Sequence, residues 1–255
     1  MLHFLSKEKI DVLLKYPFFK DFLSGVTSKK VFLENLEEFK TTLSEGGVTE
    51  SDLEILKATI TINLKNKYFI MRHGESEANR RGIIVSSPAY GIVSFGLTNE
   101  GRRQVANSVF EKKKQRLLDN KTIIYSSDFA RARETAEIAR EILRAGLVIL
   151  TAKLRERYFG NWDRTSNANY QKVWIDDANN PSHKNNGVES VMEVFERLRS
   201  LIIELEAKYA GKKILLVSHG DSLQILQTAF KGVDPSKHRY IRHLNLAEIR
   251  ELKTK

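Results

Sequence analysis

Two stretches of the sequence decide its fold: residues 68–76 read YFIMRHGES, and residues 213–221 read KILLVSHGD. In each stretch a short apolar run leads through one polar residue into a His-Gly pair. Apolar runs of this length with polar flanks are typical of strands that are buried on both faces of a sheet. Residues 122–125 (TIIY) and 147–150 (LVIL) have the same character. These four runs predict the strands of a central sheet.

Helical patterns lie between the predicted strands of residues 67–255. One helix is expected to begin at Thr98, and a second to begin with Asp128 as its cap and to close at Gly146. Residues 191–205 also carry apolar side chains at helical spacing. Strands that alternate with helices indicate an α/β fold, with a mostly parallel central sheet flanked by helices on both faces. Ligands of such sheets bind beyond the carboxyl ends of the strands.

Residues 1–66 have a different pattern and form a separate helical extension in our prediction. Apolar residues recur at helical spacing over 13–23 and again over 31–43. Thr49 or Ser51 is placed to cap a third helix. We expect two or three short helices that pack on the main domain.

The composition excludes several classes of protein. Hydrophobic residues make up 41% of the 255 residues and charged residues 29%, as in an ordinary globular chain. No uncharged apolar run approaches the roughly 18 residues of a membrane helix, and residues 1–14 mix charges among their leucines, unlike a signal peptide. We therefore expect a cytoplasmic protein with no membrane partner. The absence of cysteine excludes disulfides, thiolate metal sites and cysteine phosphatase chemistry.

The positive charge of the chain is concentrated in the main domain. The net charge is +10, from 42 Lys+Arg and 32 Asp+Glu; residues 1–66 hold 9 against 10, and the remainder 33 against 22. Such a field favours an anionic partner, either nucleic acid or a phosphorylated metabolite. The basic run Lys112–Lys114 lies on an expected helix with no aromatic residues interleaved, so we expect no nucleic-acid binding.

Polar residues follow the predicted strands at the points where these strands end. Arg72 and His73 follow the first strand, Arg131 the second, Glu156 the third and His219 the fourth. Since carboxyl ends of parallel strands meet at one edge of a sheet, we expect these side chains to converge. The other histidines lack this context and are expected on the surface: His3, His183, His238 and His243.

The converging residue types suit phosphoryl transfer. A neutral imidazole is a good nucleophile near pH 7, and guanidinium groups match the oxygens of a phosphate. A carboxylic acid with a raised pKa can protonate the leaving oxygen and afterwards activate water. No third ligand stands at a spacing that suits zinc with the two histidines, so we expect neither metal nor cofactor.

Four motifs resemble the histidine phosphatase superfamily, phosphoglycerate mutase-like branch, over about residues 67–250. They are RHGES at 72–76, RA at 131–132 with ETA at 134–136, LRE at 154–156 with FG at 159–160, and SHG at 218–220. GVES at 187–190 resembles the family's usual GGES and departs from it by a valine at the second glycine. The resemblance implies that His73 is the phosphorylated nucleophile and Glu156 the proton donor. It also implies a set of residues that hold the phosphate: Arg72, Asn79, Arg131, His219 and Gly220.

The segment 161–187 distinguishes a phosphatase from a mutase. The family's cofactor-dependent mutases carry here an arginine pair and a proline-rich stretch that grip the substrate carboxylate. This chain has one arginine, one proline and many asparagines, which we expect to form a long surface loop with a short helix around 170–174. The resemblance therefore favours a metal-independent phosphatase of small phosphorylated metabolites. The alternatives are a cofactor-dependent phosphoglycerate mutase, a phosphoprotein phosphatase, or an interaction module with a vestigial site; a homodimer is left open.

Overall fold

The chain divides into two compact units, and each is described by itself. In this computed structural model residues 6–23, 29–53 and 64–253 are described. One unit comprises residues 1–62, with which residues 232–234 are grouped, and the other comprises the rest of the chain.

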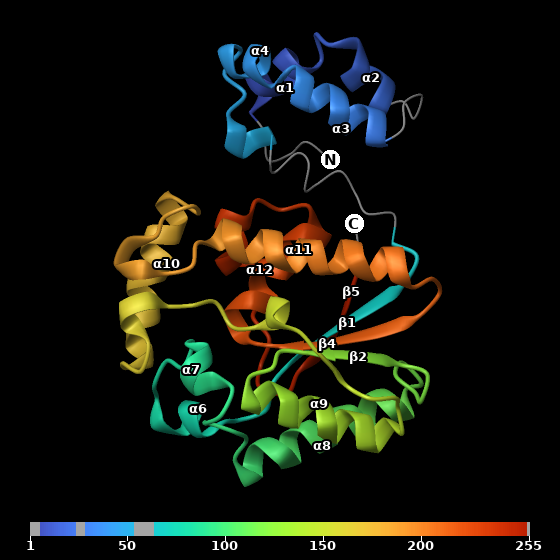
Figure 1. The fold of residues 1–255 in the computed structure, drawn as a ribbon, viewed down its shortest axis with the longest axis vertical. Helices are drawn as coiled ribbons and strands as arrows, with labels where there is room; N and C mark the ends of the chain where they lie inside the picture. The colour runs from blue at the N-terminus through green and yellow to red at the C-terminus, as the bar shows by residue number, and fades with distance from the viewer. Residues whose placement is uncertain (1–5, 24–28, 54–63, 254–255) are drawn as a thin grey trace. The chain divides into compact units, whose positions relative to one another are not determined.

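The N-terminal unit is helical (Figure 1). Its helices are α1 (Lys7–Leu13), α2 (Pro17–Leu23), α3 (Lys29–Glu38) and α4 (Lys40–Glu45). They share a core of seven buried side chains: Leu13, Phe19, Phe32, Leu36, Leu43, Val48 and Leu53.

The N-terminal helices differ from the prediction in number. The single helix expected over residues 31–43 is two helices, separated at Phe39. The predicted cap at Thr49 is present, because its hydroxyl accepts a hydrogen bond from the Asp52 N–H at 3.2 Å. Residues 50–53 are helical, whereas the rest of that predicted helix lies outside the described residues.

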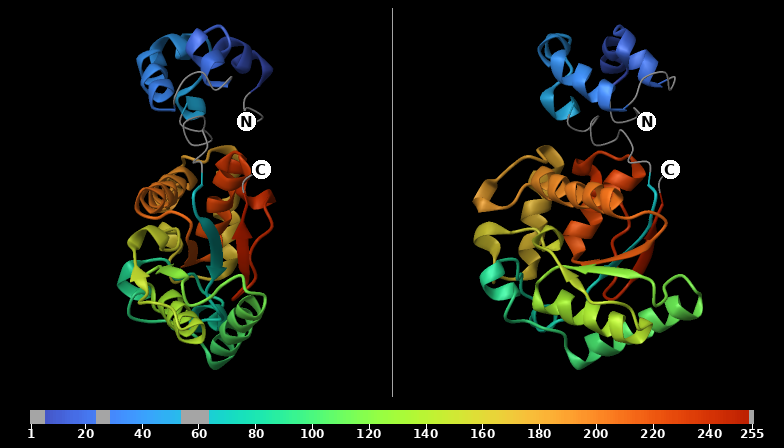
Figure 2. Two further views of the ribbon diagram at one scale, coloured as in Figure 1. Left: turned by 90° about the vertical axis from the view of Figure 1, so that its right-hand side faces the viewer. Right: turned by 45° about the vertical axis from the view of Figure 1, so that its right-hand side comes forward.

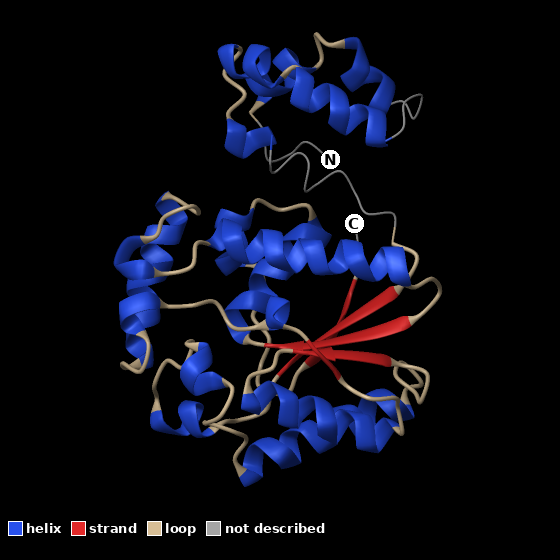
Figure 3. Ribbon diagram, in the orientation of Figure 1, coloured by secondary structure: helices blue, strands red, loops and turns tan. Residues whose placement is uncertain are grey.

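The second unit is built on a five-stranded sheet (Figure 3). Its strands are β1 (Lys67–Arg72), β2 (Ile123–Ser126), β3 (Ile149–Leu150), β4 (Lys213–Ser218) and β5 (Ile249–Leu252), in the order β3-β2-β4-β1-β5. The first four are parallel, and β5 is antiparallel to β1 at the edge. The predicted α/β fold with a mostly parallel sheet is confirmed, and β5 is an edge strand that the sequence did not reveal.

Helices cover both faces of the sheet (Figures 1 and 2). Helices α8 (Asn99–Lys114) and α9 (Ala130–Leu143) cover one face, and α11 (Val191–Lys208) and α12 (Gly220–Lys231) cover the other. The core between the sheet and the first pair contains alternate residues of the strands and small helix residues, including Phe69, Met71, Val105, Val109, Ala132, Ala136, Leu215 and Val217. A helix layer on each face leaves the strand ends as the open edge.

The termini of α8 and α9 show one correct and one wrong prediction. Thr98 caps α8, since its hydroxyl accepts from the Gly101 N–H at 3.0 Å. Asp128 does not cap α9, because its carboxylate forms a two-pronged ion pair with Arg155 at 2.5 and 2.8 Å. The last residue of α9 is followed by Arg144 in the left-handed conformation, so the helix ends before Gly146.

Shorter elements gather beside the carboxyl ends of the strands. The helices among them are α6 (Glu77–Arg81), α7 (Pro88–Gly91) and α10 (Tyr170–Asn179). The 3-10 turns are η1 (Ala152–Leu154), η2 (Gly160–Trp162), η3 (Asn167–Asn169), η4 (Asn185–Gly187) and η5 (Pro235–Tyr240). Helix α10 is longer than the helix predicted around residues 170–174. Within the described ranges, no helix is long and apolar enough to cross a membrane.

Candidate active site

The two His-Gly pairs meet at the carboxyl edge of the sheet. Strands β1 and β4 are neighbours in register, with Arg72 opposite Ser218, so the residues that follow them emerge side by side. The rings of His73 and His219 have centroids 5.2 Å apart and are inclined by 61°. Both side chains are buried. The sequence predicts that these histidines converge because each follows a strand of one parallel sheet, and in the structure the two rings are neighbours.

The hydrogen bonds of His73 determine which nitrogen is reactive. Nδ1 lies 2.7 Å from the carbonyl oxygen of Gly74, which only accepts, so Nδ1 carries the proton. Nε2 therefore holds the lone pair and accepts from Nε of Arg131 at 3.1 Å. Burial, together with the charges of Arg131 and Arg72, lowers the pKa of His73 well below its ordinary 6.5. The imidazole is neutral near pH 7, as a nucleophile must be.

Three nitrogens around His73 are buried without a hydrogen-bond partner among the described residues: Arg72 Nε, Arg131 Nη1 and His219 Nδ1. The remaining bonds of these side chains fix their positions. Arg131 donates from Nη2 to the Val85 carbonyl at 2.9 Å, and Nε2 of His219 lies 2.9 Å from the Ser127 hydroxyl. Since buried polar atoms are almost always paired in folded proteins, unpaired ones in one place indicate a binding site. Two of these nitrogens belong to guanidinium groups, whose positive charge suits a phosphoryl group. The third belongs to His219, whose pKa burial and the charge of Arg131 lower well below its ordinary 6.5.

Glu156 stands in the loop that follows β3 and η1, and it is almost fully buried. Its Oε1 accepts from the N–H groups of Arg157 and Ser222 at 3.0 and 3.2 Å. Burial raises the pKa of Glu156 above its ordinary 4.5, and the Asp221 carboxylate adds to this effect while Arg131 opposes it. A carboxyl group whose protonated form is favoured is a competent general acid.

Tyr170 lies near Glu156, Arg131 and Arg72, and its position was not predicted from the sequence. Its ring packs edge-on against Phe159 at 4.7 Å between centroids and stacks on Trp174 at 5.4 Å. Burial raises the pKa of its hydroxyl, and the charge of Glu156 raises it further, so the hydroxyl remains a hydrogen-bond donor at every physiological pH. The predicted short helix was the only signal, and it gave no reason to select this tyrosine.

A buried ionic network connects α10 to the loop of Glu156. Arg157 donates from its two terminal nitrogens to Asp177 at 2.6 and 2.7 Å, and one of them lies 3.3 Å from Asp221. Nε2 of His183 lies 2.8 Å from the same Asp177 carboxylate, and His238 is buried 3.8 Å from Asp221. The network ties the predicted polar loop to the catalytic edge of the sheet.

The expected surface position is wrong for three of the four remaining histidines. His183 and His238 are buried because the carboxylates of the ionic network attract them, and His243 contacts Arg72 with its Nε2 at 2.9 Å. His3 lies outside the described residues.

Asn79 and Gly220 stand beside the site in different ways. Asn79 is exposed, and its carboxamide oxygen accepts from the backbone N–H and hydroxyl of Ser76, which caps α6. Gly220 begins α12, and a Cβ there would lie 2.9 Å from the ring of His243 and 3.4 Å from the guanidinium carbon of Arg72. The phosphate-binding role of both residues stays a prediction.

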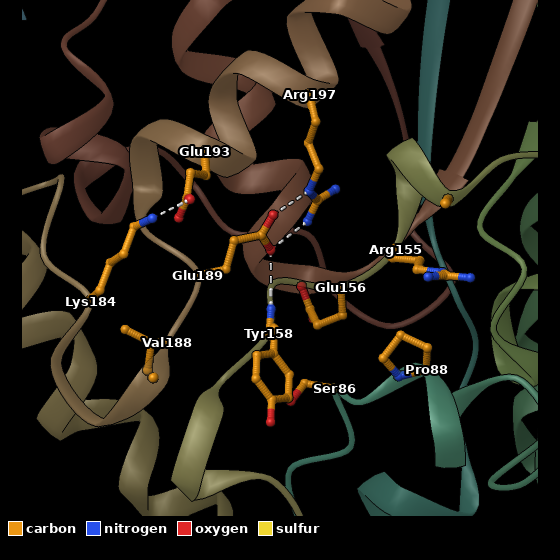
Figure 4. A pocket seen from close by; sticks show the side chains of 12 residues that line it. Ser86, Pro88, Arg155, Glu156, Tyr158, Lys184, Val188, Glu189, Glu193 and Arg197 are labelled. Carbon is orange, nitrogen blue, oxygen red and sulfur yellow. Dashed lines mark hydrogen bonds and ion pairs between the residues drawn. The ribbon is translucent and has the colours of Figure 1, made fainter.

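A cavity of about 500 Å³ borders Glu156 (Figure 4). Ser86 and Pro88 contribute to its wall, and so do Arg197 and Glu189, which form an ion pair at 2.7 Å. Across the described part of the chain, no three acidic or histidine side chains are grouped as metal ligands would be. Within the wall Arg197 pairs with Glu189 and Lys184 with Glu193, whereas Arg155 pairs with Asp128, which does not line the cavity.

Known proteins share this arrangement. A sequence model of the histidine phosphatase superfamily (branch 1) matches residues 68–255. The chain belongs to this superfamily. Its members' motifs are those on which the sequence analysis relied, so that resemblance is confirmed.

Some relatives of this histidine phosphatase are named as phosphatases and others as phosphoglycerate mutases. A probable phosphatase of Schizosaccharomyces pombe is 29% identical over 167 residues, which are 64% of this chain and 73% of the relative. A probable phosphoglycerate mutase, GpmB, of Klebsiella pneumoniae is 31% identical over 182 residues, 69% of this chain and 80% of that protein.

A mycobacterial glucosyl-3-phosphoglycerate phosphatase of known structure shares the fold, with a TM-score of 0.60 at 21% identity over 72% of this chain and 88% of the other. The family and the phosphatase relatives make this chain a phosphoric monoester hydrolase, which confirms the predicted enzyme class.

Proposed function

We propose that the protein is a metal-independent phosphatase of small phosphorylated metabolites that works through a phosphohistidine on His73. The observation that carries the proposal is the neutral Nε2 of His73 beside three buried nitrogens that have no hydrogen-bond partner among the described residues. In this mechanism Arg72, Arg131 and His219 bind the phosphoryl oxygens, and the charge that spreads over these oxygens in the transition state strengthens the contacts.

Two displacements account for the reaction. In the first, Nε2 of His73 attacks phosphorus, the bond to the ester oxygen breaks, and this oxygen takes the proton of Glu156. In the second, the Glu156 carboxylate removes a proton from water, the water oxygen attacks phosphorus, and the bond to Nε2 breaks. Inorganic phosphate leaves, and both His73 and Glu156 return to their starting states.

A small anionic substrate is favoured by the surroundings of the site. His73, His219, Arg131 and Glu156 are all buried, so the phosphoryl group must enter the protein to reach them. Residues 67–255 carry 33 basic against 22 acidic residues, which attracts multiply charged ligands. A phosphoprotein would have to present its phosphate on a narrow extension.

The decisive experiment is substrate labelling of the wild type and of His73→Ala. Brief incubation with ³²P-labelled phosphomonoester should give an acid-labile, base-stable label on the wild type alone, and turnover should be lost in the variant. As a companion, Glu156→Gln should lose far more activity with alkyl phosphates than with p-nitrophenyl phosphate, whose leaving group needs no proton. Undiminished hydrolysis by His73→Ala would refute the mechanism.

A phosphoglycerate mutase is the second candidate, since relatives such as GpmB of Klebsiella pneumoniae are named as probable mutases. Both functions begin with phosphohistidine and differ in the acceptor of the phosphoryl group. Measuring free phosphate and phosphoglycerate isomers in one reaction separates them, because a mutase interconverts the isomers much faster than it releases phosphate. A parallel panel of sugar phosphates and phosphopeptides identifies the substrate class.

A further inference from the structure

The guanidinium of Arg72 is positioned by two residues, His243 and Leu244, that take no part in the two displacement steps of the proposed mechanism. Its Nη1 donates to Nε2 of His243 at 2.9 Å and to the carbonyl oxygen of Leu244 at 3.0 Å. Both hydrogens of Nη1 are thereby engaged. The other edge of the guanidinium is formed by Nη2 and by Nε, which is buried without a hydrogen-bond partner among the described residues. This edge is one that can grip two oxygens of a phosphoryl group at once.

The acceptor role of His243 follows from its other neighbour. Gln224, buried on α12, donates from Nε2 to the Ile241 carbonyl at 2.5 Å, which fixes the orientation of its amide. Its Oε1 therefore faces Nδ1 of His243 at 3.3 Å and must receive the proton from it. Nδ1 carries the hydrogen, and Nε2 is left as a lone pair for Arg72.

Charge and packing keep His243 in that state. Burial and the charges of Arg72, Arg239 and Arg250 outweigh the opposing effect of Asp221 and lower the pKa of His243 to about 4. The ring is thus neutral near pH 7.

Gly220 leaves room for the imidazole ring. A Cβ at this position would lie 2.9 Å from Cε1 of His243 and 3.4 Å from Cζ of Arg72. The imidazole is therefore wedged between the start of α12 and the guanidinium.

We propose that His243 is a positioning residue for Arg72, which turns the Nε–Nη2 edge of the guanidinium toward the phosphoryl group. The inference rests on the proposed function, since it assumes that Arg72 binds phosphate. Removing an acceptor that orients a ligand-binding side chain typically changes affinity or rate by about 10–100-fold. His243 itself touches no reacting atom in this proposal.

A double-mutant cycle on the full-length protein tests the proposal. His243→Leu removes the acceptor, and we expect kcat/KM for p-nitrophenyl phosphate to fall about 10–100-fold. His243→Gln places a carboxamide oxygen near the position of Nε2 and should retain most of the wild-type rate. In an Arg72→Ala background, His243→Leu should cost nothing further, because its effect passes through Arg72. Inhibition by orthovanadate should follow the same pattern.

The outcomes separate the two proposals. Two results would show a merely structural role of His243 and overturn the inference. One is a loss of kcat/KM in the double variant equal to the product of the two single losses. The other is a loss of kcat/KM in His243→Gln as large as that in His243→Leu. A wild-type rate in Arg72→Ala would instead overturn the proposed function. Thermal melting shows whether each variant is folded. If His243→Leu does not fold, Gln224→Met removes the acceptor that orients the ring, and it must lower the rate in the presence of Arg72 but not in its absence.

Discussion

The ion pair between Arg157 and Asp177 gives the sharpest prediction about stability. Both side chains are fully buried, and two bonds of 2.6 and 2.7 Å join them. Removing one member of such a pair leaves a buried charge unpaired and typically costs about 3–5 kcal/mol. In Asp177→Leu the Arg157 guanidinium would still have the Asp221 carboxylate at 3.3 Å as a partner. We therefore expect this substitution to lower the free energy of unfolding by about 3 kcal/mol, at the lower end of that range. For a unit of this size the midpoint of melting should fall by about 6–12 °C.

Tryptophan fluorescence is the assay, because both tryptophans of the chain, Trp162 and Trp174, belong to the catalytic unit. The double variant Arg157→Met with Asp177→Leu should recover much of the loss, since it removes both charges together. Glu100→Gln is a matched control: it breaks a pair whose side chains are 42% and 71% exposed, and it should cost less than about 0.5 kcal/mol. A melting point of Asp177→Leu equal to that of the control would refute the reasoning.

Three further predictions concern catalysis and packing. Glu156 is protonated at pH values below its raised pKa and loses its proton as the pH rises through that pKa. We therefore expect kcat/KM for alkyl phosphates to fall as the pH rises, because the general acid is lost. The pH profile of Glu156→Gln should lack this alkaline decrease. A persistent decrease would assign it to another group. Arg131→Lys keeps the charge but loses the planar fork, and steady-state kinetics should show kcat/KM lowered by about 100-fold; a loss below threefold would contradict this role. Gly101→Ala places a Cβ 2.0 Å from the Glu75 carbonyl and should cost about 1–3 kcal/mol in fluorescence melts, whereas Gly146→Ala, with no atom within 4 Å, should cost nothing.

The fold was predictable where one local pattern decided it. Strands β1 (Lys67–Arg72) and β4 (Lys213–Ser218) extend by no more than one residue beyond the predicted runs 68–71 and 213–217, because runs buried on both faces are apolar throughout. Strand β5 escaped notice since it pairs only with β1 and is apolar only at its two ends, Ile249 and Leu252. The cap of α9 was wrong because Asp128 has a partner, Arg155, that is distant in sequence.

The site residues were predictable where they directly follow a strand of the sheet. His73 and His219 follow neighbouring parallel strands, and such topology converts a sequence position directly into a place on the sheet edge. His243 contacts Arg72, and His238 lies near Asp221. These partners belong to other elements, so no local sequence pattern predicts the contacts. A histidine without context in the sequence is therefore weak evidence for a surface position.

The bond from Nδ1 of His73 to the Gly74 carbonyl has a regiochemical consequence. With that nitrogen committed to a backbone acceptor, the proposed phosphohistidine can form only as its tele isomer. The same carbonyl also shares the positive charge that the ring acquires as phosphorus approaches, which eases loading of the enzyme. An isomer-specific antibody, or the ³¹P shift of the trapped adduct, would read this single main-chain contact directly.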